Sequence, residues 1–408
     1  MASRPKRLLL GVTGGIAAYK ALELVRRFRR LGWEVQVVMT AAARRLLGTE
    51  SFATLAGRPV AHELFPRRRP GPAADARIAH VDLAGWADVV LVAPTTANCL
   101  GKLAAGIADD LLSTLLLAVP PEKLRAGRVI LAPAMNTRMW EHPSVRRNLA
   151  GLEADGCVVV LPEPGELACG DRGAGRLADV EDLAAAVLAA AAGAGRLPDL
   201  AGARVVVTAG RTEEPLDPVR VLTNRSSGRL GLALARAFRL ARADVRLVCG
   251  ALSVSPPAAL PIETATTADS MLAALRRAVR DCDILVMCAA VGDYRPARPA
   301  RAKTHDRRLS LVLEKTPDIL KTVTAEHRPP VVIGFSHDPS TAVARTKLHA
   351  KRLDLIVANP YPTAGADTIR ATLVPARGRV TRLAGQSKDR FSRRLVAEAA
   401  RLLEKARG

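Results

Sequence analysis

The stretch "RLLLGVTGGIAAYKALELVRRFRRLG", residues 7–32, decides the fold of the first half of the chain. An apolar run of strand length reaches two glycines, and a helical pattern of apolar and basic residues follows, which is how a βαβ unit begins. Strand-like runs then recur between helical patterns, in "EVQVVMT" (34–40), "DVVLVAP" (88–94), "RVILAP" (128–133) and "CVVVLP" (157–162). This alternation predicts a doubly wound parallel sheet whose ligands bind at the carboxyl ends of the strands.

The same alternation restarts in the second half of the chain. The segment 180–203 begins with an alanine-rich helical pattern and continues with Gly, Pro and small residues. This pattern is typical of the last helix of a domain followed by a linker. Strand-like runs follow in "ARVVVTAG", "DVRLVCG", "DILVMCAAVGD", "PVVIGFS" and "DLIVANP", with a β excursion expected in "RRLSLVLEK" and a terminal helix from about Lys388. We therefore predict two α/β domains, 1–190 and 203–408, joined by a linker over 191–202.

The formal charge of +22 does not by itself indicate nucleic acid. Arginine outnumbers lysine by 50 to 11, which indicates a coding bias expressed on solvated faces, and aromatic residues for base stacking make up only 3% of the chain. The six cysteines are scattered without zinc spacing, and most of them are expected to be small buried residues. Because the sequence shows no long apolar run and no secretory segment, we predict a cytoplasmic protein with no nucleic-acid partner and no membrane contact.

Small and polar residues gather at the strand ends of the first half. "GVTGGIAAYK" (11–20) places glycines between a strand and a helix, where backbone N–H groups can hold a phosphate, although a tight turn alone would look the same. The following strands end in Thr40, in "APTTANC" (93–99) and in "APAMN" (132–136). Four such ends at one edge of a sheet predict a ligand site.

Three side chains of this half could carry chemistry. His80 has the imidazole best suited to proton transfer near neutral pH, although a lone histidine is more often structural. Cys169 lies in the glycine-rich loop "GELACGDRGAGRL", which favours a mobile thiol. Asn136 follows a buried strand, so its amide is either a ligand-facing group or part of a polar turn. Its neighbours Met135, Met139 and Trp140 are expected to pack so that they fix that amide.

Together these motifs resemble one known family. "GVTGGIAAYK", "VVMTAAARRLLGTESFATLAGRPV", "HVDLAGWADVVLVAPTTAN", "GIADDLLSTLLLA", "APAMNTRMW" and "LACGDRGAGRL" look like the ordered motifs of flavin-dependent phosphopantothenoylcysteine decarboxylases. The resemblance implies a flavodoxin-like domain with FMN, which oxidises the substrate thiol so that CO2 is lost from a thioaldehyde. The ene-thiol that remains is then reduced and protonated. By motif position, His80 is the implied base, Asn136 holds the substrate carboxylate, and Cys169 donates the proton of the reductive step.

The resemblance also implies a set of FMN contacts and one departure from the family. The contacts are Gly14, Gly15, Ile16, Ala17, Thr40, Thr95, Thr96 and Asn98. Gly15 stands where the family usually has serine, so one hydroxyl contact to the FMN phosphate is expected to be missing.

Lysine is informative in the second half because it is rare. Five of the eleven lysines, Lys303, Lys315, Lys321, Lys347 and Lys351, lie between residues 303 and 351. Lys347 and Lys351 are four apart in a helical pattern and could converge on one polyphosphate, although a solvated helix face is the alternative.

A polar loop in the second half offers further donors. "EEPLDPVRVLTNRSSGRLG" (213–231) supplies Arg220 and Asn224 and ends in SSG before a strong helix. It is therefore either an anion site or a plain capped turn.

The second half resembles a second family. "DPVRVLTNRSSGRLG", "AAVGDYRPA", "KTPDIL", "IGF" and "LDLIVAN" look like phosphopantothenate-cysteine ligase, which follows the decarboxylase in bacterial bifunctional proteins. The resemblance implies a Rossmann-like α/β domain that uses CTP and Mg2+ to form an acyl-cytidylate of 4'-phosphopantothenate, which the cysteine amine attacks with loss of CMP. Arg220 and Asn224 are the implied phosphopantothenate contacts, and Asn224 orients the acyl-cytidylate. The implied CTP contacts are Met287, Cys288, Ala289, Asp293, Lys303, Pro317, Asp318, Ile319, Leu320, Phe335, Lys347 and Lys351.

Several ligase motifs depart from the usual form of the family. They include "TAGRTEEP", in which Arg211 replaces a glycine, "AAVGD" and "GFSHDP". Two alternatives therefore stay open: an active decarboxylase whose ligase half has lost activity or changed its nucleotide, and a flavin-binding regulatory protein without catalysis. The resemblance further implies a homo-oligomer, with trimers of the flavin domain joined through ligase dimers into a dodecamer. The sequence leaves the metal ligands unassigned.

Overall fold

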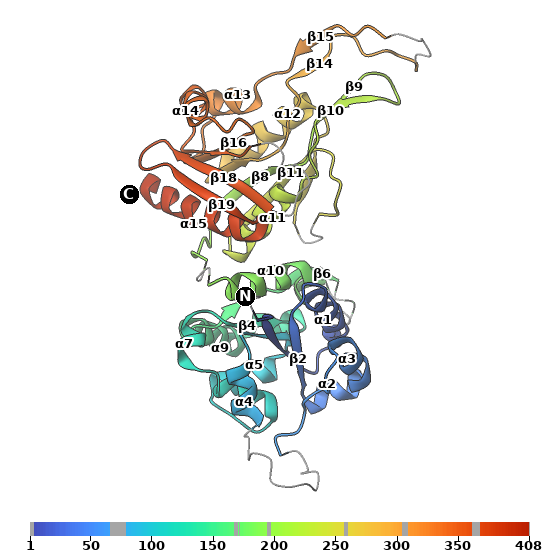
Figure 1. Cartoon of the computed structure of the whole chain (residues 1–408), viewed down its shortest axis with the longest axis vertical. Helices are drawn as coiled ribbons and strands as arrows, with labels where there is room; N and C mark the ends of the chain where they lie inside the picture. The colour runs from blue at the N-terminus through green and yellow to red at the C-terminus, as the bar shows by residue number, and fades with distance from the viewer. Residues whose placement is uncertain are drawn as a thin grey trace. The chain divides into compact units, whose positions relative to one another are not determined.

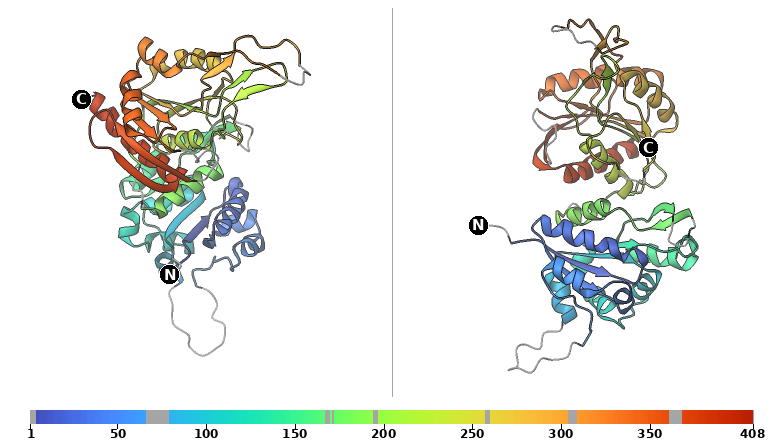
Figure 2. Two further views of the ribbon diagram at one scale, coloured as in Figure 1. Left: turned by 45° about the horizontal axis from the view of Figure 1, so that its top comes forward. Right: turned by 90° about the vertical axis from the view of Figure 1, so that its right-hand side faces the viewer.

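The computed structural model describes residues 4–65, 79–166, 170, 172–193, 197–256, 260–303, 309–360 and 368–407. The chain divides into two compact units, residues 1–196 and 197–408, and each contains its own largely parallel sheet. Helices lie on both faces of each sheet (Figure 1, Figure 2). The predicted α/β class is therefore confirmed for both halves.

The sheet of the first unit is fully parallel and has the strand order of a flavodoxin-like fold, β2-β1-β3-β4-β5. The strands are β1 (Arg7–Val12), β2 (Glu34–Met39), β3 (Val89–Thr95), β4 (Val129–Pro133) and β5 (Val158–Val159). Leu8, Leu9 and Leu10 of β1 are fully buried, and each such side chain contributes roughly 1.5–3 kcal/mol to folding. The run 157–162 forms a shorter strand than predicted, since only Val158 and Val159 pair with β4.

The helices of the first unit form two layers around this sheet. α1 (Lys20–Arg30) buries Ala21, Leu24, Val25 and Phe28, which share one helical face, and it packs beside α10 (Val180–Ala191). Side chains of α4 (Ala79–Trp86), α5 (Ala97–Ala104), α6 (Leu111–Leu117) and α9 (Pro143–Ala154) form a separate core with the strands. The remaining elements are η1 (Ile16–Tyr19), α2 (Ala41–Leu46), α3 (Thr49–Ala56), α7 (Pro121–Arg125), α8 (Thr137–Glu141) and the ribbon of β6 (Glu163–Glu166) and β7 (Arg172–Arg176).

The sheet of the second unit begins with six parallel strands in the Rossmann order and continues with two antiparallel strands, β12-β11-β8-β13-β16-β17-β18-β19. The parallel strands are β8 (Arg204–Ala209), β11 (Asp244–Cys249), β12 (Ile262–Thr264), β13 (Ile284–Met287), β16 (Val331–Ser336) and β17 (Leu355–Ala358). The antiparallel pair, β18 (Thr368–Pro375) and β19 (Thr381–Ser387), was not predicted from the sequence.

Two helical layers cover the second sheet as well. α11 (Arg229–Leu240) and α15 (Lys388–Arg407) share one core, and α12 (Ala268–Ala278), α13 (Ile319–Glu326) and α14 (Thr341–Ala350) share the other. The short helix η2 (Val279–Asp281) follows α12. The predicted start of the terminal helix at Lys388 is confirmed.

Two short ribbons extend from the second unit. They are β9 (Glu213–Pro215) with β10 (Val221–Thr223), and β14 (Tyr294–Pro296) with β15 (Leu313–Lys315), and both project beyond the sheet of this unit (Figure 1). β15 lies inside the β excursion expected over 307–315. In the part of the chain that the structure describes, no helix has both the length and the apolar character needed to cross a membrane.

Candidate functional site

The first candidate site lies between β1 and β3, where the chain changes from one side of the sheet to the other. At such a point the loops that follow two neighbouring strands diverge and leave a crevice for a ligand. Thr13, which is buried, ties these loops together. Its Oγ1 donates to the carbonyl of Pro94 at 2.7 Å and accepts from the N–H of Thr96 at 3.1 Å. Gly15 and Thr96 therefore lie side by side, since a Cβ on Gly15 would be 3.8 Å from Thr96 Cγ2.

A cavity of about 930 Å³ opens at this crevice. It is large enough for a cofactor, because ligand pockets typically measure about 300–1,000 Å³. Two of the apolar side chains that line the cavity are open to solvent: Ile16 is 68% exposed and Tyr19 is 54% exposed. The lining residues are Gly14, Gly15, Ile16, Ala17, Tyr19, Lys20, Thr96, Ala97, Ala134, Met135, Asn136, Met139, Glu166, Gly170, Gly175, Arg176 and Leu177.

Asn136 lies at the edge of this cavity, directly after β4. It is the N-cap of α8, and its Oδ1 accepts from the N–H of Arg138 at 2.9 Å, which fixes the orientation of the amide. Trp140 is buried, as predicted, and the Arg146 guanidinium lies over its ring. The prediction that Met139 is a packing residue is wrong, because this side chain is 49% exposed and lines the cavity.

The β6–β7 ribbon forms another wall of the cavity. The N–H of Met135 donates to the carbonyl of Gly175 at 2.9 Å. A Cβ atom on Gly175 would lie 2.1 Å from the Met135 carbonyl oxygen, and its φ is +149°, so only glycine permits this close approach. Glu166 and Gly170 also line the cavity. Cys169 itself lies outside the described residues.

Four residues predicted for this site are not among the described residues that line the cavity. Thr40 caps α2, and the buried Thr95 donates to the Val92 carbonyl and accepts from the N–H of Ala132. Asn98 is exposed on α5. His80 lies in the first turn of α4, and its Nδ1 is buried with no hydrogen-bond partner among the described residues.

The second candidate site lies at the corresponding position of the second unit, between β8 and β13. The buried Thr208 ties the two strand ends together, because its Oγ1 accepts from the N–H groups of Cys288 and Ala289, both at 2.9 Å. A pocket of about 70 Å³ lies beside this tie. It is lined by Gly210, Arg225, Ser226, Ser227, Gly228, Arg229, Leu230, Gly231, Cys288, Ala290, Phe335, His337, Asn359, Ile369 and Lys388.

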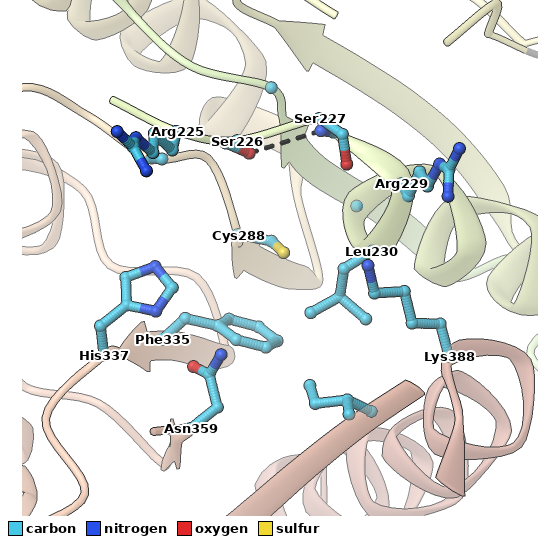
Figure 3. Close-up of a pocket in the computed structure, with 15 residues that line it drawn as sticks. Arg225, Ser226, Ser227, Arg229, Leu230, Cys288, Phe335, His337, Asn359 and Lys388 are labelled. Carbon is cyan, nitrogen blue, oxygen red and sulfur yellow. Dashed lines mark hydrogen bonds between the residues drawn. The ribbon is translucent and has the colours of Figure 1, made fainter. Parts of the chain in front are cut away.

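The pocket presents positive charge and backbone donors to a ligand. Arg225 and Arg229 lie at opposite ends of the segment that carries Ser226 and Ser227, and Lys388 of α15 extends toward Leu230 (Figure 3). No carboxylate is among the described lining residues, and α11 begins at the pocket with a glycine N-cap that makes no side-chain cap hydrogen bond, so the positive end of the helix dipole lies beside the pocket. Such a pocket suits an anion.

Two other residues that line the pocket, His337 and Cys288, are neutral. Burial, together with the nearby Lys347 ammonium, lowers the pKa of His337, so its imidazole is neutral near physiological pH. Burial also raises the pKa of the Cys288 thiol to about 12, so the thiol stays protonated and is not a nucleophile. Four other cysteines, Cys99, Cys157, Cys249 and Cys282, are buried as predicted.

Of the residues predicted to bind CTP, Cys288 and Phe335 line the pocket (Figure 3). Met287 ends β13, and Ala289 follows Cys288 beside Thr208. Asp293 and Lys303 are exposed. Ile319 and Leu320 have side chains in the core, so only their backbone could contact a ligand, and Pro317 precedes them at the start of α13.

The two lysines of α14 are held by neighbouring polar groups. Lys347 Nζ donates to Ser336 Oγ at 3.0 Å. Lys351 Nζ pairs with the carboxylate of Asp318, at 2.9 Å from its Oδ2. This pair is partly exposed, and such a pair is worth only about 0–1 kcal/mol. A bound phosphate could therefore replace Asp318 as the partner of Lys351 with little loss of free energy.

The residues predicted to bind phosphopantothenate lie on the loop between β9 and α11. Asn224 Nδ2 donates to the carbonyl of Val291 at 2.9 Å, which ties this loop to the segment after β13. Arg220 Nε donates to Asp217 Oδ2 at 2.7 Å, and this pairing lowers the pKa of the Asp217 carboxyl. The described residues contain no group of three or more His, Cys, Asp or Glu side chains that could hold a metal ion.

Sequence reasoning missed three kinds of site residue. Thr13 and Thr208 each act through one hydroxyl that bridges two strand ends. A single threonine at a strand end does not predict such a bridge from the sequence. Arg225 and Arg229 were hidden among the many arginines. Lys388 was detectable, because it is one of only eleven lysines.

Comparisons with known proteins agree with this two-part organisation. Residues 1–192 match the family model described as Flavoprotein, and residues 200–403 match the DNA/pantothenate metabolism flavoprotein C-terminal domain. The coenzyme A biosynthesis bifunctional protein CoaBC of Escherichia coli (strain K12) is 40% identical over 374 residues, which covers 88% of each chain. The protein of the same name from Bacillus subtilis (strain 168) is 39% identical over 409 residues, which covers 97% of each chain.

Among solved structures, the C-terminal domain of a coenzyme A biosynthesis bifunctional protein CoaBC is 31% identical to this chain, with a TM-score of 0.45. It covers 51% of this chain and 98% of its own length. The two family models together span almost all of the chain, and the Bacillus subtilis relative matches it over 97% of each chain. The chain therefore belongs to the family of bifunctional enzymes of coenzyme A biosynthesis.

Proposed function

We propose that the first domain predicted from the sequence, residues 1–190, which lies within the first unit, is an FMN-dependent decarboxylase that converts 4'-phosphopantothenoylcysteine to 4'-phosphopantetheine. The observation that carries this proposal is the cavity of about 930 Å³ at the β1–β3 crevice, which brings Gly14, Gly15, Thr96 and Asn136 to one space. Its lining suits a flavin, since backbone N–H groups in the first turn of η1 can meet a phosphate and apolar side chains can cover a ring. When bound there, FMN supplies the two-electron oxidation and reduction that the reaction requires.

The residues of the chain would bind and orient the substrate and move protons. Asn136, held by its bond to the Arg138 N–H, presents an amide at the cavity edge, where it would bind the substrate carboxylate. Glu166 and Gly170 line the cavity on either side of the segment that contains Cys169, which is the proposed proton donor. His80 remains the proposed base by motif position.

Gly15 offers a direct test of the flavin phosphate position. Its φ of −110° is open to any residue, and an added Cβ would lie 3.3 Å from Pro94 Cγ, so serine fits with a small adjustment. We expect Gly15→Ser to add a hydroxyl donor to the phosphate and to lower the Kd for FMN about threefold to tenfold, the value of one hydrogen bond. Titration of the flavin-free protein with FMN, followed by flavin fluorescence, measures this change.

Gly14→Ser is the matched control. A Cβ at Gly14 would lie 2.4 Å from the Ala42 Cβ, so this variant should bind FMN more weakly than the native protein. Weaker FMN binding in Gly15→Ser than in the native protein would place the phosphate elsewhere.

Asn136→Asp tests the proposed carboxylate site without loss of the helix cap, because aspartate caps a helix as well as asparagine does. The new carboxylate would repel that of the substrate, and we expect kcat/KM for CO2 release to fall about 100-fold or more. Flavin content should stay at the native level. Native turnover in this variant would remove Asn136 from the site.

We further propose that the second domain predicted from the sequence, residues 203–408, which lies within the second unit, is the ligase that joins 4'-phosphopantothenate to cysteine with CTP. The substrate carboxylate would attack the α-phosphate of CTP, pyrophosphate would leave, and the cysteine amine would then displace CMP from the acyl-cytidylate. The positive pocket beside Thr208 supports this assignment, because Arg225, Arg229 and Lys388 can stabilise charge on separating phosphates. Mg2+ would be held chiefly by the nucleotide phosphates, as it often is in such sites.

The nucleotide choice of the ligase is tested by pyrophosphate release. With 4'-phosphopantothenate, cysteine and Mg2+, we expect release with CTP and at least about tenfold less with ATP at equal concentration, the effect of one well-placed contact. Lys347→Ala should raise the KM for CTP, and Lys405→Ala, at the exposed end of α15, is the control. Equal rates with both nucleotides would contradict the assignment to CTP.

The oligomeric state is part of the proposal. Apolar side chains are exposed on the two ribbons of the second unit, among them Val219 at 67% and Val312 at 78%, and we propose that ligase units pair through them. If these pairs join trimers of the flavin domain into a dodecamer, Val312→Glu should reduce the assembly from twelve chains to three, measured by light scattering. A native protein that is monomeric at micromolar concentration would contradict the pairing.

A further inference from the structure

Arg211 lies directly after the strand that ends at the second candidate site. Its backbone pairs with Ala251, with the Arg211 N–H at 3.1 Å from the Ala251 carbonyl and the Ala251 N–H at 2.8 Å from the Arg211 carbonyl. These two hydrogen bonds fix the backbone from which the Arg211 side chain extends. That side chain is 22% exposed. Arg211 is not among the described residues that line the pocket, whereas its neighbour Gly210 is.

The Arg211 guanidinium connects three separate segments. Nη1 donates to the Ser226 carbonyl at 2.9 Å and to Ser253 Oγ at 3.0 Å. Nη2 lies 3.1 Å from Glu213 Oε1. A planar guanidinium can hold several acceptors in fixed directions, which an ammonium cannot do equally well.

The segment that receives this bond is the loop Arg225–Gly228, which lines the pocket and leads into α11. The loop is also tied to Ser253, whose N–H donates to the Ser227 carbonyl at 3.2 Å. Gly228 packs closely on Gly210, since a Cβ on Gly228 would lie 3.3 Å from the Gly210 nitrogen. The position of the loop relative to β8 therefore depends on a small set of contacts, and Arg211 supplies a charged one.

We propose that Arg211 is a positioning residue that holds the loop Arg225–Gly228 where its hydroxyl and N–H groups meet the nucleotide. This inference rests on the proposed ligase function of the second unit. Arg211 acts through the loop and does not touch the ligand. Its loss should therefore weaken nucleotide binding more than it slows the chemical step.

The test compares Arg211→Ala with the native full-length protein by two readouts. Hydrogen–deuterium exchange should become faster in the backbone of residues 224–228, with the β8 backbone unchanged. The KM for CTP should rise about tenfold, the value of one charge-assisted hydrogen bond, while kcat stays within about twofold. Arg211→Lys should restore only part of both changes, because an ammonium holds several acceptors in fixed directions less well than a planar guanidinium does.

Arg276→Ala is the matched control, since it removes an exposed arginine that pairs with Glu326 on the same unit away from the pocket. It should change neither readout. Decarboxylation of supplied 4'-phosphopantothenoylcysteine should also stay at the native rate in Arg211→Ala.

Three results would overturn the proposal: native exchange over residues 224–228 in Arg211→Ala, faster exchange throughout the sheet, or a lower kcat at unchanged KM. If the native protein uses no CTP at all, the proposed ligase function fails. The exchange measurement then still decides whether Arg211 holds the loop.

Discussion

A buried threonine hydroxyl at the end of the first strand holds the ligand crevice together in each unit. Thr13 bridges the Pro94 carbonyl and the Thr96 N–H in the first unit, and Thr208 accepts from Cys288 and Ala289 in the second. In both sheets this strand neighbours the one at which the chain changes sides, so the loops diverge beyond the threonine. Loss of either hydroxyl would leave buried backbone groups without their partner and let the two loops move independently.

The two crevices occupy the same position in their sheets, but they suit different chemistry because the elements around them differ. In the first unit the β6–β7 ribbon and the exposed Ile16 and Tyr19 enclose a wide, partly apolar space. In the second unit the helices α11 and α15 bring Arg229 and Lys388 to a narrow pocket. A wide apolar cavity suits a flavin ring, and a narrow positive pocket suits phosphate. In the proposed function, ligation comes first and takes place in the second unit. Decarboxylation follows and takes place in the first unit.

Most of the parallel strands were predictable because both of their faces are buried, which leaves continuous apolar runs such as residues 7–12 in the sequence. The short parallel strand β12 was not predicted, because its side chains are exposed or half-buried and it forms no apolar run. β18 and β19 were not predicted either, because neither contains a continuous apolar run: β18 alternates buried apolar side chains with exposed ones, and β19 is largely exposed. The glycines and Asn136 at the first crevice could be found from strand-end positions. The threonine bridges, the exposed position of Met139 and the contacts of Arg211 depend on neighbours that are distant in sequence.

The central claim is that one chain carries out both steps. Its most direct test is the release of CO2 from cysteine labelled at the carboxyl carbon, supplied with 4'-phosphopantothenate, CTP and Mg2+ to the FMN-loaded protein. The proposed function predicts that labelled CO2 appears only when CTP and 4'-phosphopantothenate are both present, and that one pyrophosphate is released for each CO2. Labelled CO2 in the absence of CTP, or pyrophosphate release without any CO2, would contradict it.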